Sequence, residues 1–138
     1  MQANRGRDTS PELAVRSRLF ALGRRYRVCT PLPFDRRRRA DLFFVRQRLY
    51  VFIDGCFWHG CPQHYAEPKT NVAFWRTKLE GNRIRDEDTN LKLRGLGYRV
   101  VRFWEHADPD LVCQEILRHL DSQTDMAFID SELISRGE

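Results

Sequence analysis

The densest group of reactive side chains lies in a Gly-, Cys- and His-rich loop near the middle of the chain. Cys56 and Cys61 are five residues apart, and His64 follows three residues later. Zinc prefers sulfur and imidazole ligands, and three of them within nine residues of irregular chain can wrap a tetrahedral ion. A closed structural site needs a fourth ligand, for which His106 is the first candidate and His59 the competitor. A loop that binds no metal is the alternative interpretation.

Carboxylates form the second group. Asp41 opens one expected strand, Asp54 closes the next, and Glu12 lies on an expected helix upstream. Carboxylates that meet in this way hold Mg²⁺ against a phosphate. A neutral imidazole at His59 could accept a proton from an attacking water. Since a single Asp at a strand end is more commonly a turn or cap residue, only the combination with His59 and with basic flanks favours phosphate chemistry.

Aromatic residues form the third group. Phe57 and Trp58 are adjacent in a polar loop, and Trp75 lies near the start of an expected helix. Two neighbouring large aromatics in such a loop do not easily both face inward, and one use for exposed aromatics is as wedges between DNA base steps. Phe74, at helical spacing, is expected to lie in the core.

Charge is distributed unevenly over the 138 residues, whose mass of 16.4 kDa is that of one domain. Residues 1–39 carry a net charge of +8, residues 40–105 +3 and residues 106–138 −6. A basic front suggests a polyanion as partner, with an ordinary solvated surface as the equal alternative. No apolar run is long enough to span a bilayer, and no secretory leader is visible, so we expect a cytoplasmic protein with free thiols.

Apolar periodicity and turn residues predict the elements that position these groups. Their order is helix, three strands, helix, strand, helix, which indicates an α/β domain with a small mixed sheet. We expect one domain over residues 1–122, with residues 1–9 as a flexible basic arm and 123–138 as an acidic C-terminal tail. The expected elements are a helix from Ser10 to about Gly23, strands at Tyr26–Cys29, Ala40–Val45 and Leu49–Asp54, a helix from Asn71 to about Gly95, a strand at Tyr98–Trp104 and an amphipathic helix from Asp108.

The candidate residues fall within a series of short strings spread over residues 5–106. The strings are Arg7-Asp8-Thr9 before Glu12, Ala40-Asp41-Leu42, Val51-Phe52-Ile53-Asp54-Gly55-Cys56-Phe57-Trp58-His59, Phe74-Trp75-Arg76-Thr77-Lys78, Asn82 to Asp86, and Gly97-Tyr98-Arg99-Val100 through Trp104-Glu105. This series resembles the very-short-patch repair (Vsr) endonucleases. The resemblance implies a restriction-endonuclease-like fold, in which helices flank a small mixed central sheet and a structural zinc site is added.

The resemblance also implies roles for individual residues. Asp41 would bind Mg²⁺, His59 would be the catalytic histidine, and Glu12 would bind metal-bound water. Asp86 would orient the ring of His59, as second carboxylates commonly do.

Five further residues would contact DNA by the same resemblance. Phe57, Trp58 and Trp75 match aromatics that wedge into the duplex beside a mismatch. Lys78 and Asn82 match groups that contact the DNA around it.

The chain departs from the family at both metal sites. A known member has threonine and histidine where this chain has Ile53 and Asp54. A backbone carbonyl at Ile53 can still bind Mg²⁺, and Asp54 is an additional candidate ligand, although adjacent strand residues point to opposite faces. The implied zinc ligands, of which only the first is shared with that member, are Cys56, Cys61, His64 and His106.

The function implied is a Mg²⁺-dependent endonuclease that nicks one strand of double-stranded DNA 5′ to the T of T·G mismatches left by deamination of 5-methylcytosine. It would act as a monomer in the bacterial cytoplasm, associated with the nucleoid when bound to DNA, with other repair proteins as candidate partners and no membrane. The first alternative is a Vsr-like nuclease of a restriction or defence system that cuts other DNA. A zinc-stabilised DNA-binding module without catalysis is less favoured.

Overall fold

The computed structural model describes residues 10–56, 61–63 and 66–135, and the side chains as far as residue 122. The described elements are α1 (Ser10–Ala21), β1 (Arg27–Pro31), β2 (Arg39–Phe44), β3 (Leu49–Asp54), α3 (Val72–Gly95), β4 (Arg99–Trp104) and α4 (Pro109–Ser135). This order confirms the predicted α/β class. None of the described helices combines the length and apolar composition needed to cross a membrane.

The four strands form one mixed sheet in the order β1-β2-β3-β4. β1 pairs with β2 and β2 with β3 in antiparallel fashion, whereas β3 and β4 are parallel, with α3 as the crossover that a parallel pair requires. β2 and β3, joined by the short turn at residues 45–48, therefore form a hairpin, as the two β-rich runs in the sequence indicate. Because β2 runs antiparallel to β3, and β4 runs parallel to β3, β2 begins at the end of the sheet where β3 and β4 finish. We call this the carboxyl end of the sheet.

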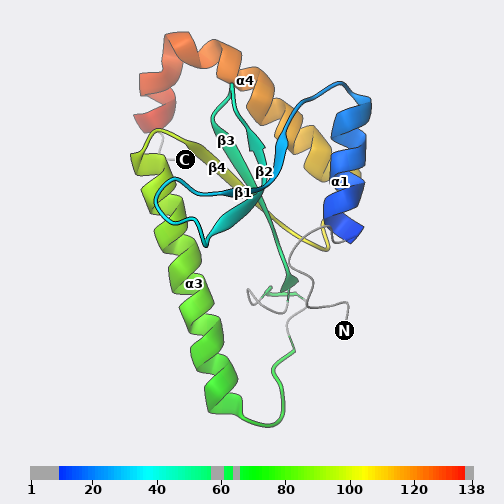
Figure 1. Cartoon of the computed structure of the whole chain (residues 1–138), viewed down its shortest axis with the longest axis vertical. Helices are drawn as coiled ribbons and strands as arrows, with labels where there is room; N and C mark the ends of the chain where they lie inside the picture. The colour runs from blue at the N-terminus through cyan, green and yellow to red at the C-terminus, as the bar shows by residue number, and fades with distance from the viewer. Residues whose placement is uncertain (1–9, 57–60, 64–65, 136–138) are drawn as a thin grey trace.

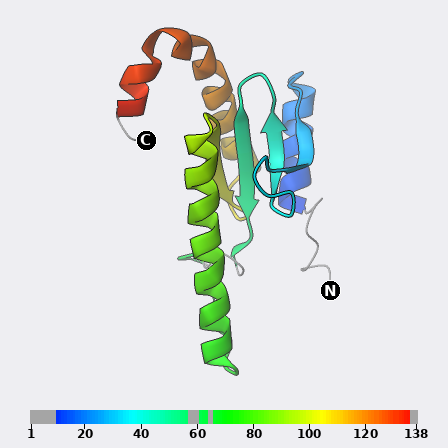
Figure 2. The ribbon, with the colours of Figure 1, turned by 60° about the vertical axis from the view of Figure 1, so that its left-hand side comes forward.

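Helices cover both faces of the sheet (Figures 1 and 2). On one face, α1 and α4 pack together over the larger core, and on the other face the C-terminal half of α3 covers a smaller one. Sequestering these apolar side chains supplies the main driving force for folding. The larger core contains Val15, Leu19, Leu42, Phe44, Leu49, Val51, Val112, Cys113, Ile116 and Leu120, and the smaller contains Leu32, Ala40, Tyr50, Phe52 and Leu93.

The N-terminal half of α3 extends beyond the sheet (Figure 2). At 24 residues, α3 is about 36 Å long. Its buried residues are Asn82, near the middle of the helix, and Thr89 and Leu93 in the C-terminal half. The expectation that Phe74 lies in the core is therefore wrong. Its side chain is 58% exposed, because none of the described helices and strands covers this part of α3.

Two helices also differ in detail from the apolar patterns. On α1, Val15 and Leu19 are buried, but Leu13 and Phe20 are exposed, since only one narrow face meets the sheet. α4 continues to Ser135, so helical backbone extends through most of the segment expected as an acidic tail.

Candidate active site and metal centre

Asp41 lies where β2 and β3 separate at the carboxyl end of the sheet. Backbone pairing of the two strands runs as far as Leu42 and Val51. Beyond that point the Asp41 side chain takes over, because its Oδ2 accepts a hydrogen bond of 2.6 Å from the backbone N–H of Ile53. The carboxylate is thus fixed in the fork between the strands, two residues before β3 ends.

Three carboxylates from three elements meet around this fork. The pKa of Asp41 is raised to about 7, mainly by burial and also by the negative charges of Glu12 and Asp54, against the opposing effects of the Ile53 N–H and Arg102. Glu12, in the first turn of α1, is only 2% exposed. Such crowding of acidic groups in a partly desolvated place is typical of sites that bind a cation or exchange a proton.

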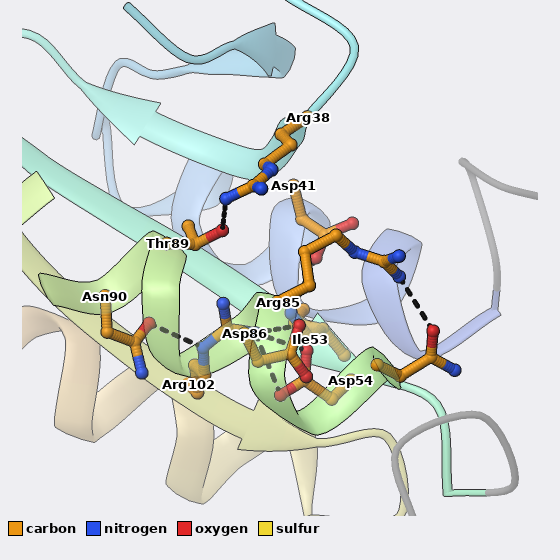
Figure 3. A network of polar contacts seen from close by, with 10 residues as sticks. Arg38, Asp41, Ile53, Asp54, Arg85, Asp86, Thr89, Asn90 and Arg102 are labelled. Carbon is orange, nitrogen blue, oxygen red and sulfur yellow. Dashed lines mark hydrogen bonds and ion pairs between the residues drawn. The ribbon is translucent and has the colours of Figure 1, made fainter. Parts of the chain in front are cut away.

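Arg102 on β4 contacts residues of β3 and α3 beside the carboxylates (Figure 3). Its Nη1 donates to both carboxylate oxygens of Asp54, at 2.9 and 3.2 Å, and its Nε donates to Asn90 Oδ1 at 2.9 Å. The guanidinium lies 4.1 Å from the centre of the Phe52 ring, and Asp86 is 3.8 Å away. Arg102 therefore joins β3, β4 and α3, and it holds the Asp54 carboxylate in an ion pair.

The face of α3 that covers this end of the sheet carries two of the predicted site residues. Asn82 and Asp86 are one helical turn apart, which places them on the same side of the helix. Asn82 is buried, and its Oδ1 accepts a hydrogen bond of 2.9 Å from Arg85 Nη2. Further towards the N-terminus, Trp75 is half-buried and Lys78 is exposed, on the half of α3 that extends past the sheet.

A group of two thiols and one imidazole lies just beyond the ends of β3 and β4. Cys56 Sγ is 3.2 Å and Cys61 Sγ 3.6 Å from His106 Nδ1, and the three candidate ligand atoms all lie within 4.8 Å of one another. Burial and the adjacent Cys61 raise the pKa of Cys56 to about 11. A bound cation would instead favour the deprotonated form of the Cys56 thiol. Two sulfurs and one nitrogen are ligands that suit a borderline-soft ion.

Two hydrogen bonds of Glu105 connect this group with the carboxylates. Glu105 N–H donates to the carbonyl of Asp54, and Glu105 Oε2 accepts from the N–H of Cys56, both at 2.9 Å. The parallel pairing of β3 and β4 continues in this way past the last strand residues. Asp54 and the Cys/His group are therefore parts of one rigid corner.

The structure thus brings Glu12, Asp41 and Asp54 together, and separately Cys56, Cys61 and His106. His59, His64, Phe57 and Trp58 lie outside the described residues. Sequence reasoning missed Arg102, although an arginine between Val101 and Phe103 in a strand was a signal, because a buried charge needs partners.

The known proteins that the chain resembles are named as DNA mismatch endonucleases or type II nicking enzymes. Residues 1–65 match the profile of the family described as DNA mismatch endonuclease Vsr. The chain is 43% identical over 135 residues to the type II nicking enzyme V.NaeI of Lentzea aerocolonigenes, with 94% of this chain and 81% of the relative covered. It is 38% identical to V.XorIIP of Xanthomonas oryzae pv. oryzae, with 80% of each chain covered. Similarity to the DNA mismatch endonuclease Vsr of Escherichia coli (strain K12) is 35% identity, over 78% of this chain and 67% of that one.

The raised pKa of Asp41 predicts how stability depends on pH. A carboxyl whose pKa rises from 3.8 to about 7 on folding destabilises the fold progressively as the pH increases between these values. Asp41→Asn removes this penalty, so its stability advantage over the wild type should grow by about 2 kcal/mol between pH 5 and pH 7, and then level off. Urea unfolding of protein without divalent ions at a series of pH values measures it. Glu87→Gln, which removes an exposed carboxylate from α3, should show no such trend, and a parallel trend in both variants would contradict the assignment.

The Arg102 ion pair predicts strong coupling with Asp54. The side chains of Arg102 and Asp54 are 18% and 12% exposed, so Arg102→Met should destabilise the fold by about 3 kcal/mol by leaving buried negative charge uncompensated. Arg102→Met combined with Asp54→Asn should recover most of that loss. A double-mutant cycle of urea unfolding measures the coupling, and simple additivity of the two substitutions would refute the pairing.

Proposed function

The chain belongs to the Vsr family of DNA endonucleases, and from that membership we propose that it nicks one strand of duplex DNA 5′ to the T of a T·G mismatch, in a reaction that requires Mg²⁺. The observation that carries the proposal is the meeting of Glu12, Asp41 and Asp54 at the carboxyl end of the sheet, with the pKa of Asp41 raised to about 7. One such site suffices to cut one strand, so we propose a monomer.

The carboxylate cluster suits a hard divalent ion. Mg²⁺ takes oxygen ligands and keeps several waters, and the oxygens of Asp41 and the backbone carbonyl of Ile53 would hold it. Asp54 would compensate Arg102 instead of serving as a ligand, because both of its oxygens accept hydrogen bonds from that guanidinium. An ion bound here stabilises negative charge on the scissile phosphate and the leaving oxygen.

Proton transfer is assigned to His59. His59 follows Cys56 by only three residues in the sequence, and this short separation from the end of β3 along the chain supports the assignment. In this proposal the imidazole takes a proton from the attacking water, and Asp86 fixes its tautomer and ring direction. Glu12 orders water on the side of α1.

The Cys/His group would hold structural zinc. Cys56, Cys61 and His106 supply three ligands, and His64, three residues after Cys61, is the fourth. Zinc at this position would close the loop between the two cysteines, which carries His59 and the aromatics Phe57 and Trp58. Its role is therefore to position the catalytic and wedge side chains.

Recognition of the mismatch is assigned to aromatic wedges and to α3. The part of α3 that extends past the sheet carries Trp75 and Lys78 (Figure 1), and these would meet the duplex together with Phe57 and Trp58. A wobble pair is easier to unstack than a matched pair, so insertion of wedges favours mismatched DNA. Asn82, buried against Arg85, would support this surface from within the protein.

Zinc content tests the metal centre. The wild type should bind about one zinc per chain, and Cys61→Ser should lose it and unfold at lower temperature. Metal analysis of dialysed protein and thermal unfolding measure the two effects. Cys113→Ser is the matched control, because it also removes a buried thiol, but from the core beneath α4. Equal zinc content in the two variants would contradict the assignment.

A strand-resolved nicking assay tests the activity. Duplexes that carry T·G, C·G or 5-methyl-C·G at one position, in several sequence contexts with Mg²⁺, should be cut only when they hold T·G, and only on the T strand. Asp41→Ala should abolish cutting by removing the carboxylate at the fork. His59→Ala should lose cutting by at least about 100-fold and keep DNA binding, as expected for a general base.

The same assay separates the second candidate function. Several relatives are named as type II nicking enzymes, a name that specifies no mismatch. Nicking of matched duplexes at a defined sequence would support a restriction- or defence-associated nuclease and overturn the mismatch proposal. Absence of any nick would favour a DNA-binding module.

A further inference from the structure

The loop between β1 and β2 has a defined shape. The N–H of Leu32 donates to the carbonyl of Arg38 at 2.9 Å, which closes residues 32–38 at the base. Within the loop, Asp35 Oδ1 accepts from Arg37 N–H and the Asp35 carbonyl accepts from Arg38 N–H, both at 3.0 Å. Leu32 is buried in the smaller core. The loop is therefore held by its own backbone and by the core beneath it.

Arg38 fastens this loop to α3 (Figure 3). Its Nη1 donates to Asp88 Oδ2 at 2.8 Å and to Thr89 Oγ1 at 3.0 Å. The guanidinium also lies 5.7 Å from the centre of the Phe34 ring. Arg38 is thus engaged within the protein, and the loop has a fixed place on the helix.

Arg36 and Arg37 at the tip are both exposed. The Arg37 side chain is 93% exposed, and its Nε lies 3.6 Å from Asp35 Oδ1, an ion pair that is weak in water. The planar guanidinium matches phosphate oxygens, and a fixed loop lowers the entropy lost when it binds one. Arg39, the last of the four arginines, is also engaged within the protein, because its Nη1 donates to the Cys29 carbonyl at 2.9 Å. The run therefore divides into two engaged arginines, Arg38 and Arg39, and a presented pair.

The tip lies at the end of the sheet where the candidate active site is. β2 starts with Arg39, directly after the loop, and reaches Asp41 two residues later. Along α3, the anchor at Asp88 is ten residues beyond Lys78, or about 15 Å. That distance corresponds to about four base-pair steps of a duplex. A duplex held by α3 and by the carboxylates would extend over the loop.

We propose that Arg36 and Arg37 bind backbone phosphates of the duplex on one flank of the nicked bond. The contact rests on the proposed function, since it takes duplex DNA as the ligand. It anchors matched and mismatched DNA equally, because phosphates carry no sequence information. Discrimination then depends on the other side chains, and the loop supplies affinity and register.

The chain provides a matched control at the other end of the sheet. Arg46 is an exposed arginine in the turn between β2 and β3, after the last residue of β2. Arg46→Ala removes an exposed positive charge, as Arg36→Ala or Arg37→Ala does, but far from the carboxyl end.

Binding of intact duplex, measured by fluorescence anisotropy in Mg²⁺-free buffer without chelator, tests the contact. Arg36→Ala with Arg37→Ala should raise Kd about tenfold at 0.1 M salt, equally for T·G and matched duplexes. The slope of log K against log salt should become less steep by about 1 for each lost phosphate contact. Arg46→Ala should leave both quantities near the wild-type values.

Neutral methylphosphonate linkages, placed one at a time, locate the contact. Substitution at the contacted phosphates should weaken binding of the wild type and have no effect on the double variant. An effect of the double variant no larger than that of Arg46→Ala would overturn the proposal, and so would a loss confined to one flanking sequence, which would indicate base readout. Loss of T·G selectivity in the nicking assay, with these binding results intact, would overturn the mismatch proposal alone. If the wild type binds no duplex at all, both proposals fail.

Discussion

The hydrogen bond from Ile53 N–H to the Asp41 carboxylate is the constraint on which the site depends. It ends the antiparallel pairing of β2 and β3 and replaces a backbone acceptor by a side-chain one. A carboxylate is thereby held in the fork of a sheet whose outer faces are already covered by helices. Its position leaves Asp41 poorly solvated and close to Glu12, so the fold tolerates a destabilising charge at the candidate active site.

Arg102 offsets only part of the destabilisation caused by the buried carboxylates. Its guanidinium forms an ion pair with Asp54 and lies near Asp86, and it lowers the pKa of Asp41 only slightly. Had the cation been placed against Asp41 directly, the fork would hold a satisfied ion pair with no need of a metal ion. Asp54 and Asp86 lie against the Arg102 guanidinium, whereas Asp41 keeps a raised pKa.

The sequence predicted the order of the elements and the proximity of Cys56, Cys61 and His106. The β2–β3 hairpin followed from two β-rich runs around a short turn, and His106 was placed near the two cysteines because it follows a strand end. The exposure of Phe74 could not be predicted, since helical spacing does not reveal how far a helix extends past the sheet it covers. Arg102 was not predicted as a site residue, because its partners come from β3 and α3. Only the tertiary fold brings these partners within 3.2 Å of the guanidinium.

The parallel pairing of β3 and β4 explains why the metal-ligand group and the acidic site are neighbours. Parallel strands end at the same side of a sheet, so residues that follow them meet without further folding. Asp54 and Cys56 follow from β3, and Glu105 and His106 follow from β4, joined by the bond from Glu105 N–H to the Asp54 carbonyl. A shift in either strand would move both groups together. The corner therefore couples the geometry of the Cys/His group to that of the carboxylates, and a single packing arrangement sets both.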